Sequence, residues 1–427
     1  MLSNLTVGLL GCGVVGSGVV RLLREHADEI AARLGARIEL GPVAVRDLSR
    51  ARDLDLPLLT DDPRKVVADP QVDIVVEVMG GLDAAHALVA DALRAGKSVV
   101  TANKVLIAAA GHELTDLARA NRVRLEYEAA VAGAVPIIKP MRESLAGDRV
   151  RRVLGILNGT TNFILTRMTD EGMAFDEALA TAQGLGYAEA DPTADVSGAD
   201  AAAKTAILAS IAFDARVTAD DVYTEGITAV TPTDIANARR MGYVVKLLGI
   251  AEDTDGGVSV RVHPALVPTD HPLANVRDAY NAVFVSADAA GSLMFYGRGA
   301  GSLPTASAVV GDVVTVARGL LAAERPPLSA PPVPRPLCDV ESVVVQSAVL
   351  LDVADEPGVL AAVAATFGAN GVSIESVWQE GRGEVAQLLL ITHAAREGGI
   401  RATLAALRDL PTVRDVASVL RVEGGEV

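Results

Sequence analysis

The chain has 427 residues, half of them hydrophobic, so it can form two or three domains with sizeable cores. Its formal net charge of −16 disfavours nucleic acid and membrane surfaces as partners, because both carry negative charge. The chain has two cysteines, no basic leader sequence and no apolar run of membrane-spanning length, so we expect a cytoplasmic protein without disulfides. Its six histidines show no zinc-ligand spacing.

The first elements of the chain have the pattern of a dinucleotide-binding unit. The apolar run Leu5–Leu10 predicts a buried strand, and helical periodicity follows from Ser17 to His26. Glycines between them allow a tight turn and a close approach of the backbone to a pyrophosphate at the helix N-terminus. The motif alone is a weak signal, and a purely structural glycine turn is the alternative. It consists of Gly11, Cys12, Gly13, Val14, Val15 and Gly16.

The end of the second predicted strand, Ile38–Val45, bears on the choice of cofactor. Arg46 follows it directly, and an arginine at this place accommodates the 2′-phosphate of NADP. An acidic residue there would instead bind the ribose hydroxyl of NAD, and Asp47 is adjacent. Arg46 therefore favours NADP over NAD, unless it is only a solvated loop charge.

Three more strands complete the predicted parallel sheet of a domain that spans residues 1–136. In an open α/β sheet, residues at the carboxyl ends of the strands face the ligand crevice. Thr101 and Lys104 lie at such an end, so they are candidate contacts for cofactor or substrate. The alternative for Lys104 is a surface lysine without a role. The strands are Val72–Met79, Lys97–Thr101 and Val123–Tyr127, and the small-residue turn Glu128–Pro136 closes the domain.

Residues 137–304 are expected to form a second, α+β domain. Alternation of polar and apolar residues is clearest over Val258–Val262, which predicts an antiparallel sheet covered on one face. A polar turn, Asn158–Asn162, is expected before a helix that begins at Phe163. The helix Thr305–Ala323 is expected to return to the first domain. The other expected elements are a helix over Phe175–Gln183 and strands over Val150–Leu157, Val244–Ala251, Val258–Val267 and Ala282–Asp288.

The segment Gly184–Ala212 concentrates ionisable residues beside an apolar helix. From Ala201 to Phe213 almost every residue is apolar, which predicts a helix that is buried nearly all round. Asp200 and Lys204 are four residues apart and share one face of it. An exposed ion pair is the general expectation for such spacing, but a lysine in a buried helix needs a partner or a function. We therefore predict a carboxylate-lined pocket with one amine, formed by Glu189, Asp191, Asp195, Asp200 and Lys204.

The C-terminal part follows a proline-rich stretch, Glu324–Pro336, which predicts a linker that reaches residue 342. Residues 343–427 then show the element order βαββαβ of a ferredoxin-like module. The turn Asp355–Gly358 precedes a helix, where exposed N–H groups suit the carboxylate of an amino acid. Because the linker separates the module from the catalytic candidates, we expect the chemistry not to need it. The alternative to a regulatory site is a module that only builds an oligomer.

With these motifs in view, essentially the whole chain resembles homoserine dehydrogenase of the form with a C-terminal ACT domain. The most specific segment is GYAEADPTADVSGADAAAK. The ACT signature is LLDVADEPGVLAAVA, and NGVSIESVWQ continues it. The other matching segments are GCGVVG, VTANKVLIA, YEAAVAGAVPII, GILNGTTNFIL and GAGSLPTASAVVGD.

The resemblance implies NAD(P)H-dependent interconversion of L-aspartate 4-semialdehyde and L-homoserine. The fold would combine a Rossmann-type nucleotide domain, an α+β catalytic and dimerisation domain, and a ferredoxin-like ACT domain. Lys204 would be the general acid/base, Lys104 would contact cofactor and substrate, and Asp195 would support the lysine. Glu189 and Asp200 would hold the amino group and the hydroxyl end of the substrate.

The resemblance also implies ligands around this centre. Gly186 and Gly301 would lie near the nicotinamide. A homodimer or homotetramer is expected, with L-threonine as the effector of the ACT domain. A monovalent cation, sodium, would be bound by one carboxylate and backbone carbonyls of the loop containing Glu128, Val131, Gly133 and Val135.

Two other functions stay open at this point. One is another amino-acid dehydrogenase on the same nucleotide fold, such as one acting on aspartate. The other is a non-catalytic amino-acid sensor in which only the C-terminal module binds a ligand. The joint presence of Lys104, Glu189, Asp200 and Lys204 argues against a sensor, which has no need of them.

Overall fold

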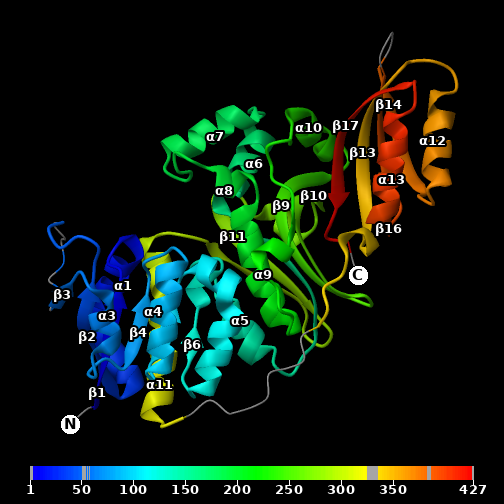
Figure 1. The fold of residues 1–427 in the computed structure, drawn as a ribbon. Helices are drawn as coiled ribbons and strands as arrows, with labels where there is room; N and C mark the ends of the chain where they lie inside the picture. Colours follow the sequence, from blue (N-terminus) through cyan, green and yellow to red (C-terminus); the bar gives the residue numbers. More distant parts are fainter. Residues whose placement is uncertain are drawn as a thin grey trace.

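The computed structural model describes residues 3–50, 54, 56, 58–324, 335–381 and 386–425. Most of the predicted proline-rich linker, residues 325–334, lies outside the described residues. Figure 1 shows three regions, with the N-terminal one at the lower left, a central one, and a small C-terminal module at the upper right.

A six-stranded parallel sheet, in the order β3-β2-β1-β4-β5-β6, forms the core of the N-terminal region. Its central strands are rich in valine, isoleucine and leucine because helices bury both faces. This doubly wound arrangement confirms the predicted Rossmann-type fold. The strands are β1 (Ser3–Leu10), β2 (Ala36–Ala44), β3 (Leu58–Thr60), β4 (Ile74–Glu77), β5 (Ser98–Thr101) and β6 (Leu125–Glu126).

Within the described part of the chain, six helices cover this sheet, three on each face. One of them, α11, comes from far along the chain and packs against α1. A methyl group added at Gly18 of α1 would lie 2.9 Å from the Cβ of Ala306, so the two helices are in close contact. Ser302 Oγ also donates a hydrogen bond of 2.7 Å to the carbonyl oxygen of Val14. The helices are α1 (Val14–Glu25), α2 (Ala27–Leu34) and α11 (Ser302–Leu321) on one face, and α3 (Pro63–Ala68), α4 (Asp83–Arg94) and α5 (Lys104–Ala120) on the other.

The central region is an antiparallel sheet in the order β12-β11-β7-β9-β10, with helices on one face. The helix α9 packs on β7, β9 and β10 and is buried along most of its length. The strands are β7 (Val150–Ile156), β8 (Tyr223–Thr224), β9 (Tyr243–Thr254), β10 (Gly257–Pro268), β11 (Tyr280–Ala287) and β12 (Gly291–Arg298). The helices are α6 (Gly159–Glu171), α7 (Phe175–Gly184), α8 (Thr193–Val196), α9 (Ala199–Phe213) and α10 (Pro232–Arg240).

The helix α6 begins at Gly159, so the expected polar turn before Phe163 is wrong. Asn158 caps the helix by accepting a hydrogen bond of 2.8 Å from the backbone N–H of Thr161. Low helix propensity of the Asn, Gly and Thr residues suggested a turn, but the cap and the burial of Thr161 outweigh it. The polar residues of this segment therefore form the first turn of a buried helix.

The C-terminal module is a four-stranded antiparallel sheet in the order β17-β13-β15-β14, with two helices on one face. It confirms the predicted ferredoxin-like element order. Arg240 of α10 forms an ion pair of 2.6 Å with Glu380 of the module, and both side chains are exposed. Its elements are β13 (Val344–Val353), α12 (Val359–Ala369), β14 (Ile374–Glu380), β15 (Ala386–Thr392), β16 (Ala395–Arg396), α13 (Glu397–Arg408) and β17 (Val413–Val422).

The module continues the central sheet, which sequence analysis did not foresee. β17 pairs in parallel with β10 over two residues, and the two sheets become one. Beyond β17, Glu423 is buried and binds Arg152 and Arg261, the latter at 3.1 Å. Arg261 and Ser259 belong to the polar positions that predicted a solvent-facing side of β10, yet both are buried. The expectation that only one face of β10 is covered is therefore wrong, because Glu423 after β17 and Glu252 of β9 pair with Arg261 on the other face.

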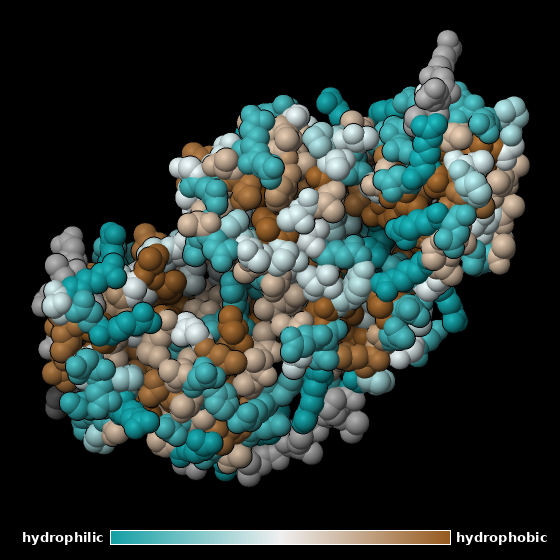
Figure 2. Space-filling model, turned by 45° about the horizontal axis from the view of Figure 1, so that its top comes forward, coloured by the Kyte–Doolittle hydropathy of each residue, from teal (hydrophilic) through white to brown (hydrophobic). Residues whose placement is uncertain are grey.

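The surface of the molecule mixes polar and apolar residues. Figure 2 shows hydrophilic and hydrophobic residues interspersed over one face. Among the residues that the structure describes, no helix is long and apolar enough to cross a membrane. The remaining short helical turns lie at Glu128–Ala130, Pro140–Ser144, Ala219–Asp221, Pro272–Asn275 and Val340–Ser342.

Loss of the Glu423 charge should destabilise the chain more than loss of an exposed one. Burial alone would raise the pKa of Glu423, but Arg261 and Arg152 outweigh it and keep the pKa low. Glu423→Gln leaves two buried guanidinium groups short of a countercharge, so we expect a loss of about 3–5 kcal/mol in unfolding free energy. The measurement is urea denaturation followed by far-ultraviolet circular dichroism.

Glu380→Gln is the matched control, because it breaks an exposed ion pair between the same two regions. We expect it to cost at most about 1 kcal/mol. Equal losses for the two variants would show that Glu423 is not an important link between the module and the central sheet.

Candidate active site

The first turn of α9 brings one carboxylate against two lysines. Asp200 Oδ2 accepts a hydrogen bond of 2.6 Å from Lys204 Nζ, and Asp200 Oδ1 accepts one from Lys104 Nζ of α5. Lys204 Nζ also donates to the carbonyl oxygen of Leu157, 2.7 Å away. Asp200 and Lys204 are buried, whereas the Lys104 side chain is 41% exposed. The predicted pair is therefore internal, and a second lysine joins it from the N-terminal region.

The electrostatics of this contact keep the carboxylate charged. Burial opposes ionisation of Asp200, but the ammonium groups of Lys204 and Lys104 outweigh it and hold the pKa of Asp200 well below its usual range. An ammonium group has three N–H donors. Within the described part of the chain, Lys204 directs two of them to Asp200 and Leu157. The third is available to a ligand.

Lys104 is the first residue of α5, and a buried carboxylate at the end of β4 helps to place it. Glu77 accepts a hydrogen bond of 2.6 Å from the hydroxyl of Thr101, which itself accepts one of 3.0 Å from the backbone N–H of Asn103. Asn103 caps α5 by accepting from the N–H of Leu106 at 3.1 Å. These hydrogen bonds therefore hold the backbone of Lys104 in place at the carboxyl edge of the parallel sheet.

Asn158 belongs to the same network, although sequence analysis gave it no functional role. Its Nδ2 donates to Asp200 Oδ2 at 2.9 Å and to Asp195 Oδ1 at 2.7 Å. Asp195 thus reaches Asp200 through this amide. An asparagine before a helix indicates a cap. Only the fold shows that the amide nitrogen of this asparagine also binds two carboxylates, one from α8 and one from α9.

The loop between α7 and α8 carries the other predicted carboxylates on the surface. Glu189 is exposed, and its carboxylate makes no hydrogen bond or ion pair with any residue that the structure describes. Asp191 is also exposed and accepts from the backbone N–H of Thr193 at 3.1 Å. Gly186 has a φ of 76°, which favours glycine. Of the four predicted carboxylates, the structure brings only Asp195 and Asp200 together.

The glycine-rich turn between β1 and α1 borders a cavity of about 540 Å³. A methyl group added at Gly16 would lie 2.2 Å from the carbonyl oxygen of Gly11, and Gly11 itself has a φ of 99°. A methyl group at Gly13 would meet no atom within 4 Å, so the amino end of α1 is open there. A tight turn beside an open helix N-terminus fits the pyrophosphate of a dinucleotide.

Two arginines line this cavity beyond β2. They are Arg46 and Arg50, and Asp47 lies between them. Asp47 accepts hydrogen bonds from the backbone N–H and the hydroxyl of Ser49, at 2.8 and 2.6 Å. Its carboxylate is thus engaged within its own loop, and Asp61 supplies a second carboxylate to the lining beside Arg46.

The loop predicted to bind sodium is compact, and its carboxylate faces backbone amides. Glu128 accepts hydrogen bonds of 2.6, 2.7 and 2.8 Å from the N–H groups of residues 137–139. Gly133 has a φ of 56°, and a methyl group there would lie 2.4 Å from the carbonyl oxygen of Gly299. The loop therefore packs against the segment that leads through Gly301 into α11.

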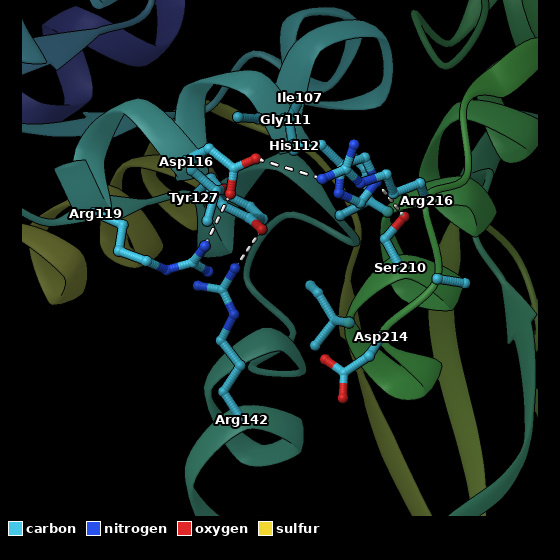
Figure 3. Close-up of a pocket in the computed structure, with 14 residues that line it drawn as sticks. Ile107, Gly111, His112, Asp116, Arg119, Tyr127, Arg142, Ser210, Asp214 and Arg216 are labelled. Atoms are coloured by element: carbon cyan, nitrogen blue, oxygen red, sulfur yellow. Dashed lines mark hydrogen bonds and ion pairs between the residues drawn. The ribbon is translucent and has the colours of Figure 1, made fainter. Parts of the chain in front are cut away.

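A separate cavity of about 200 Å³ lies between the carboxyl-terminal halves of α5 and α9 (Figure 3). Ser210 Oγ lies 3.3 Å from His112 Nε2, and Asp116 pairs with Arg216 at 3.5 Å. Burial, reinforced by Arg216, lowers the pKa of His112. No predicted site residue lines this cavity. Its contacts instead join the carboxyl-terminal ends of α5 and α9. The first turns of these two helices, at their opposite ends, form the lysine–carboxylate contact.

The positions of the dinucleotide cavity and of the lysine–carboxylate contact indicate the class of protein. The glycine turn and Lys104 lie at the carboxyl edge of the same parallel sheet, where a dinucleotide binds. An amine next to a nicotinamide can move the proton that accompanies hydride transfer, so the chain is a nicotinamide-dependent dehydrogenase. Comparison with known proteins narrows the class, and the chain belongs to the homoserine dehydrogenase family.

Three family profiles match successive parts of the chain. The homoserine dehydrogenase NAD-binding domain matches residues 11–128, the homoserine dehydrogenase profile residues 136–314, and the ACT domain residues 347–412. A homoserine dehydrogenase of Mycobacterium leprae is 51% identical, covering 98% of this chain and 97% of that protein.

Solved structures agree with these matches. The crystal structure of a homoserine dehydrogenase from Thiobacillus denitrificans has a TM-score of 0.95 and 44% identity, covering 99% of both chains. A hyperthermophilic archaeal homoserine dehydrogenase in complex with NADPH has a TM-score of 0.64 and 27% identity, covering 76% of this chain and 100% of that one.

Proposed function

We propose that the chain catalyses the reversible reduction of L-aspartate 4-semialdehyde to L-homoserine with NADPH. The buried contact of Asp200 with Lys204 and Lys104 carries the proposal, because it joins an amine to the crevice of the nucleotide domain. An amino-acid sensor would gain nothing from two lysines held this way. A dehydrogenase acting on another amino acid is the remaining alternative, and the family comparison favours homoserine.

Lys204 is the residue that we propose for proton transfer, because its amine is buried beside Asp200. A bound nicotinamide would supply the hydride in reduction and take it in oxidation. In reduction, Lys204 as an ammonium donates a proton to the aldehyde oxygen while that oxygen gains negative charge. In oxidation, the neutral amine accepts the proton of the hydroxyl group. Asp200 and the carbonyl of Leu157 orient the amine, so that its third N–H faces the reacting oxygen.

The two charged ends of the substrate need partners of opposite sign. Both oxygens of Asp200 are already bound to lysines or Asn158, so its proposed role is to hold them near the hydroxyl end. Glu189 is the exposed carboxylate proposed for the substrate ammonium. Lys104, partly exposed and bonded once in the described structure, is proposed for the substrate carboxylate and the cofactor.

The remaining ligands are proposed from the loops. Arg46, which lines the dinucleotide cavity, favours the 2′-phosphate of NADP, with Thr101, Gly186 and Gly301 near the dinucleotide. A sodium ion at the loop would be held by backbone carbonyl oxygens, because the Glu128 carboxylate is occupied by amides. The proposed carbonyl oxygens are those of Glu128, Val131, Gly133 and Val135.

The proposed assembly and regulation follow the domain division. We assign residues 1–136 with 305–323 to the nucleotide domain, 137–304 to the catalytic and dimerisation domain, and 343–427 to the ACT domain. The chain would form a homodimer or homotetramer. L-threonine is the proposed effector of the ACT domain.

The first prediction tests the proton-transferring residue. Lys204→Ala should lower the turnover of L-homoserine with NADP by about 10²–10⁴-fold, the range for loss of a general acid or base. Cofactor binding should be retained, because Lys204 does not line the dinucleotide cavity. The measurement is the absorbance of the reduced nicotinamide, with Lys65→Ala on the exposed face of α3 as the matched control. Near-parental turnover in Lys204→Ala would exclude this role.

The second prediction concerns the choice of cofactor. Arg46→Ala should weaken NADP binding by about 1.5–3 kcal/mol, the value of a hydrogen bond between charged groups, and hardly change NAD binding. Titration calorimetry with each cofactor measures both affinities. Arg33→Ala removes an exposed guanidinium outside the cavity and serves as the control. Equal losses for NADP and NAD would mean that Arg46 does not read the 2′-phosphate.

The third prediction concerns the effector. L-threonine should inhibit homoserine oxidation by the intact chain, with a coupling free energy of about 1–3 kcal/mol between the two ligands. The measurement is the initial rate across a threonine titration at several homoserine concentrations. Rates that do not change with threonine would show that the effector is another molecule.

A further inference from the structure

The cavity between the carboxyl-terminal halves of α5 and α9 collects arginines from three separate segments (Figure 3). Arg119 belongs to the last turn of α5, Arg142 to the short helical turn Pro140–Ser144, and Arg216 to the segment after α9. Two carboxylates, those of Asp116 and Asp214, belong to the described residues of the lining. One positive charge is therefore in excess, in a chain whose net charge is −16.

Asp116 orients two of the guanidinium groups and leaves most of their donors free. Its Oδ1 accepts a hydrogen bond of 2.8 Å from Arg119 Nη1, and its Oδ2 lies 3.5 Å from Arg216 Nη2. Each guanidinium has five N–H donors, so this one carboxylate cannot satisfy them. Asp214 is exposed, and Figure 3 shows its carboxylate apart from Asp116 and its two arginines.

The third guanidinium group is held by an aromatic side chain. Arg142 Nη2 donates to the hydroxyl of Tyr127, and the guanidinium carbon lies 4.5 Å from the centre of the Tyr127 ring. Glu126 lies 3.6 Å from Arg142 but also pairs with Arg124 at 3.7 Å. Because one carboxylate is shared by two arginines, the positive charge of Arg142 is only partly compensated.

Partial burial strengthens the attraction of this cavity for an anion. The side chains of Arg119 and Arg142 are 25% and 31% exposed, so solvent and salt screen them less than charges on the open surface. Burial and the charge of Arg216 lower the pKa of His112, so its imidazole is neutral near pH 7 and can still form a hydrogen bond. Apolar side chains complete the wall and lower the local dielectric constant. They are those of Ile107, Ile207 and Ile211.

The arrangement suits a tetrahedral oxyanion better than a planar carboxylate. A carboxylate offers two oxygens in one plane, and a single bidentate arginine can bind both. Guanidinium groups on three segments need acceptors in several directions, which the oxygens of a phosphate group provide. The cavity of about 200 Å³ is smaller than the roughly 300–1,000 Å³ of sites for larger organic ligands, so it suits a small anion rather than a nucleotide.

We propose that this cavity binds inorganic phosphate or the phosphate group of a small monoester. Bound there, the anion accepts hydrogen bonds from Arg119, Arg142 and Arg216. It thereby ties α5 of the N-terminal region to the segment after α9 of the central region. The proposal goes beyond the dehydrogenase function, because binding requires no step of that reaction.

The test is titration calorimetry of the intact chain with inorganic phosphate, at constant ionic strength and with saturating NADP. The cofactor is present because the glycine-rich turn before α1 would otherwise offer phosphate a second site. We expect saturable binding, and Arg216→Gln should weaken it by about 10-fold or more, as expected for loss of a charge-assisted hydrogen bond. Acetate should bind more weakly than phosphate.

Matched variants locate the binding site. Arg216→Gln should fold, because the side chain is 56% exposed and its one ion pair within the described residues is that with Asp116. Arg142→Gln is a second variant that should weaken binding, whereas Arg239→Gln removes an exposed guanidinium of α10 outside the cavity and should bind phosphate like the parent. Hydrogen exchange should slow on addition of phosphate in residues 112–119 and 210–217.

The absence of saturable phosphate binding would overturn the proposal, and so would binding that Arg216→Gln and Arg142→Gln leave unchanged. Acetate that binds as tightly as phosphate would also overturn it, because the site would then be one for carboxylates. Methyl phosphate distinguishes the two sources of the phosphate group. Binding as tight as that of inorganic phosphate would support a monoester as the ligand, and weaker binding would support the free ion.

Discussion

One buried carboxylate holds the two halves of the active site together. Asp200 belongs to the central region, and it binds Lys204 on its own helix and Lys104 from the nucleotide-binding region. Removal of Asp200 would leave Lys204 buried without its countercharge, which costs several kcal/mol. The position of a nicotinamide bound in the crevice relative to Lys204, the proposed proton-transferring residue, would therefore depend on this contact. Glu77 and Asn158 serve the same purpose from either side, one behind Lys104 and the other behind Asp200.

Much of the fold follows from local patterns in the sequence. The run of β-branched residues up to Glu77 and the glycine motif at Gly11 indicate the parallel sheet and its dinucleotide turn, because both patterns are local. The lysine–carboxylate pair was also predictable, since Asp200 and Lys204 lie one helical turn apart in an apolar helix. Asn158 could not be assigned in this way. A cap asparagine has the same local pattern whether its amide meets solvent or two carboxylates.

The misjudged strand β10 shows where the sequence pattern misleads. Ser259, Arg261 and His263 alternate with valines, which normally indicates a face in water. In the fold they are buried by Glu423, more than 150 residues later in the chain, and by Glu252 of the neighbouring strand. Burial lowers the pKa of His263 to about 4, so it stays neutral beside the arginines. Ion pairing between distant segments leaves no periodic signal, so the shared sheet could not be foreseen.

That shared sheet changes what the C-terminal module can do. A module attached only by a flexible linker could bind an effector without altering the active site, because no rigid contact would carry the change. Here β17 continues the central sheet, and Arg421 connects α13 to the loop at Glu225. A ligand can influence catalysis only if it binds two arrangements of the protein with different affinity. Any change in the module would reach the active site through Arg421, which joins α13 to the loop whose Ile227 N–H donates to the carbonyl oxygen of Val196, next to Asp195.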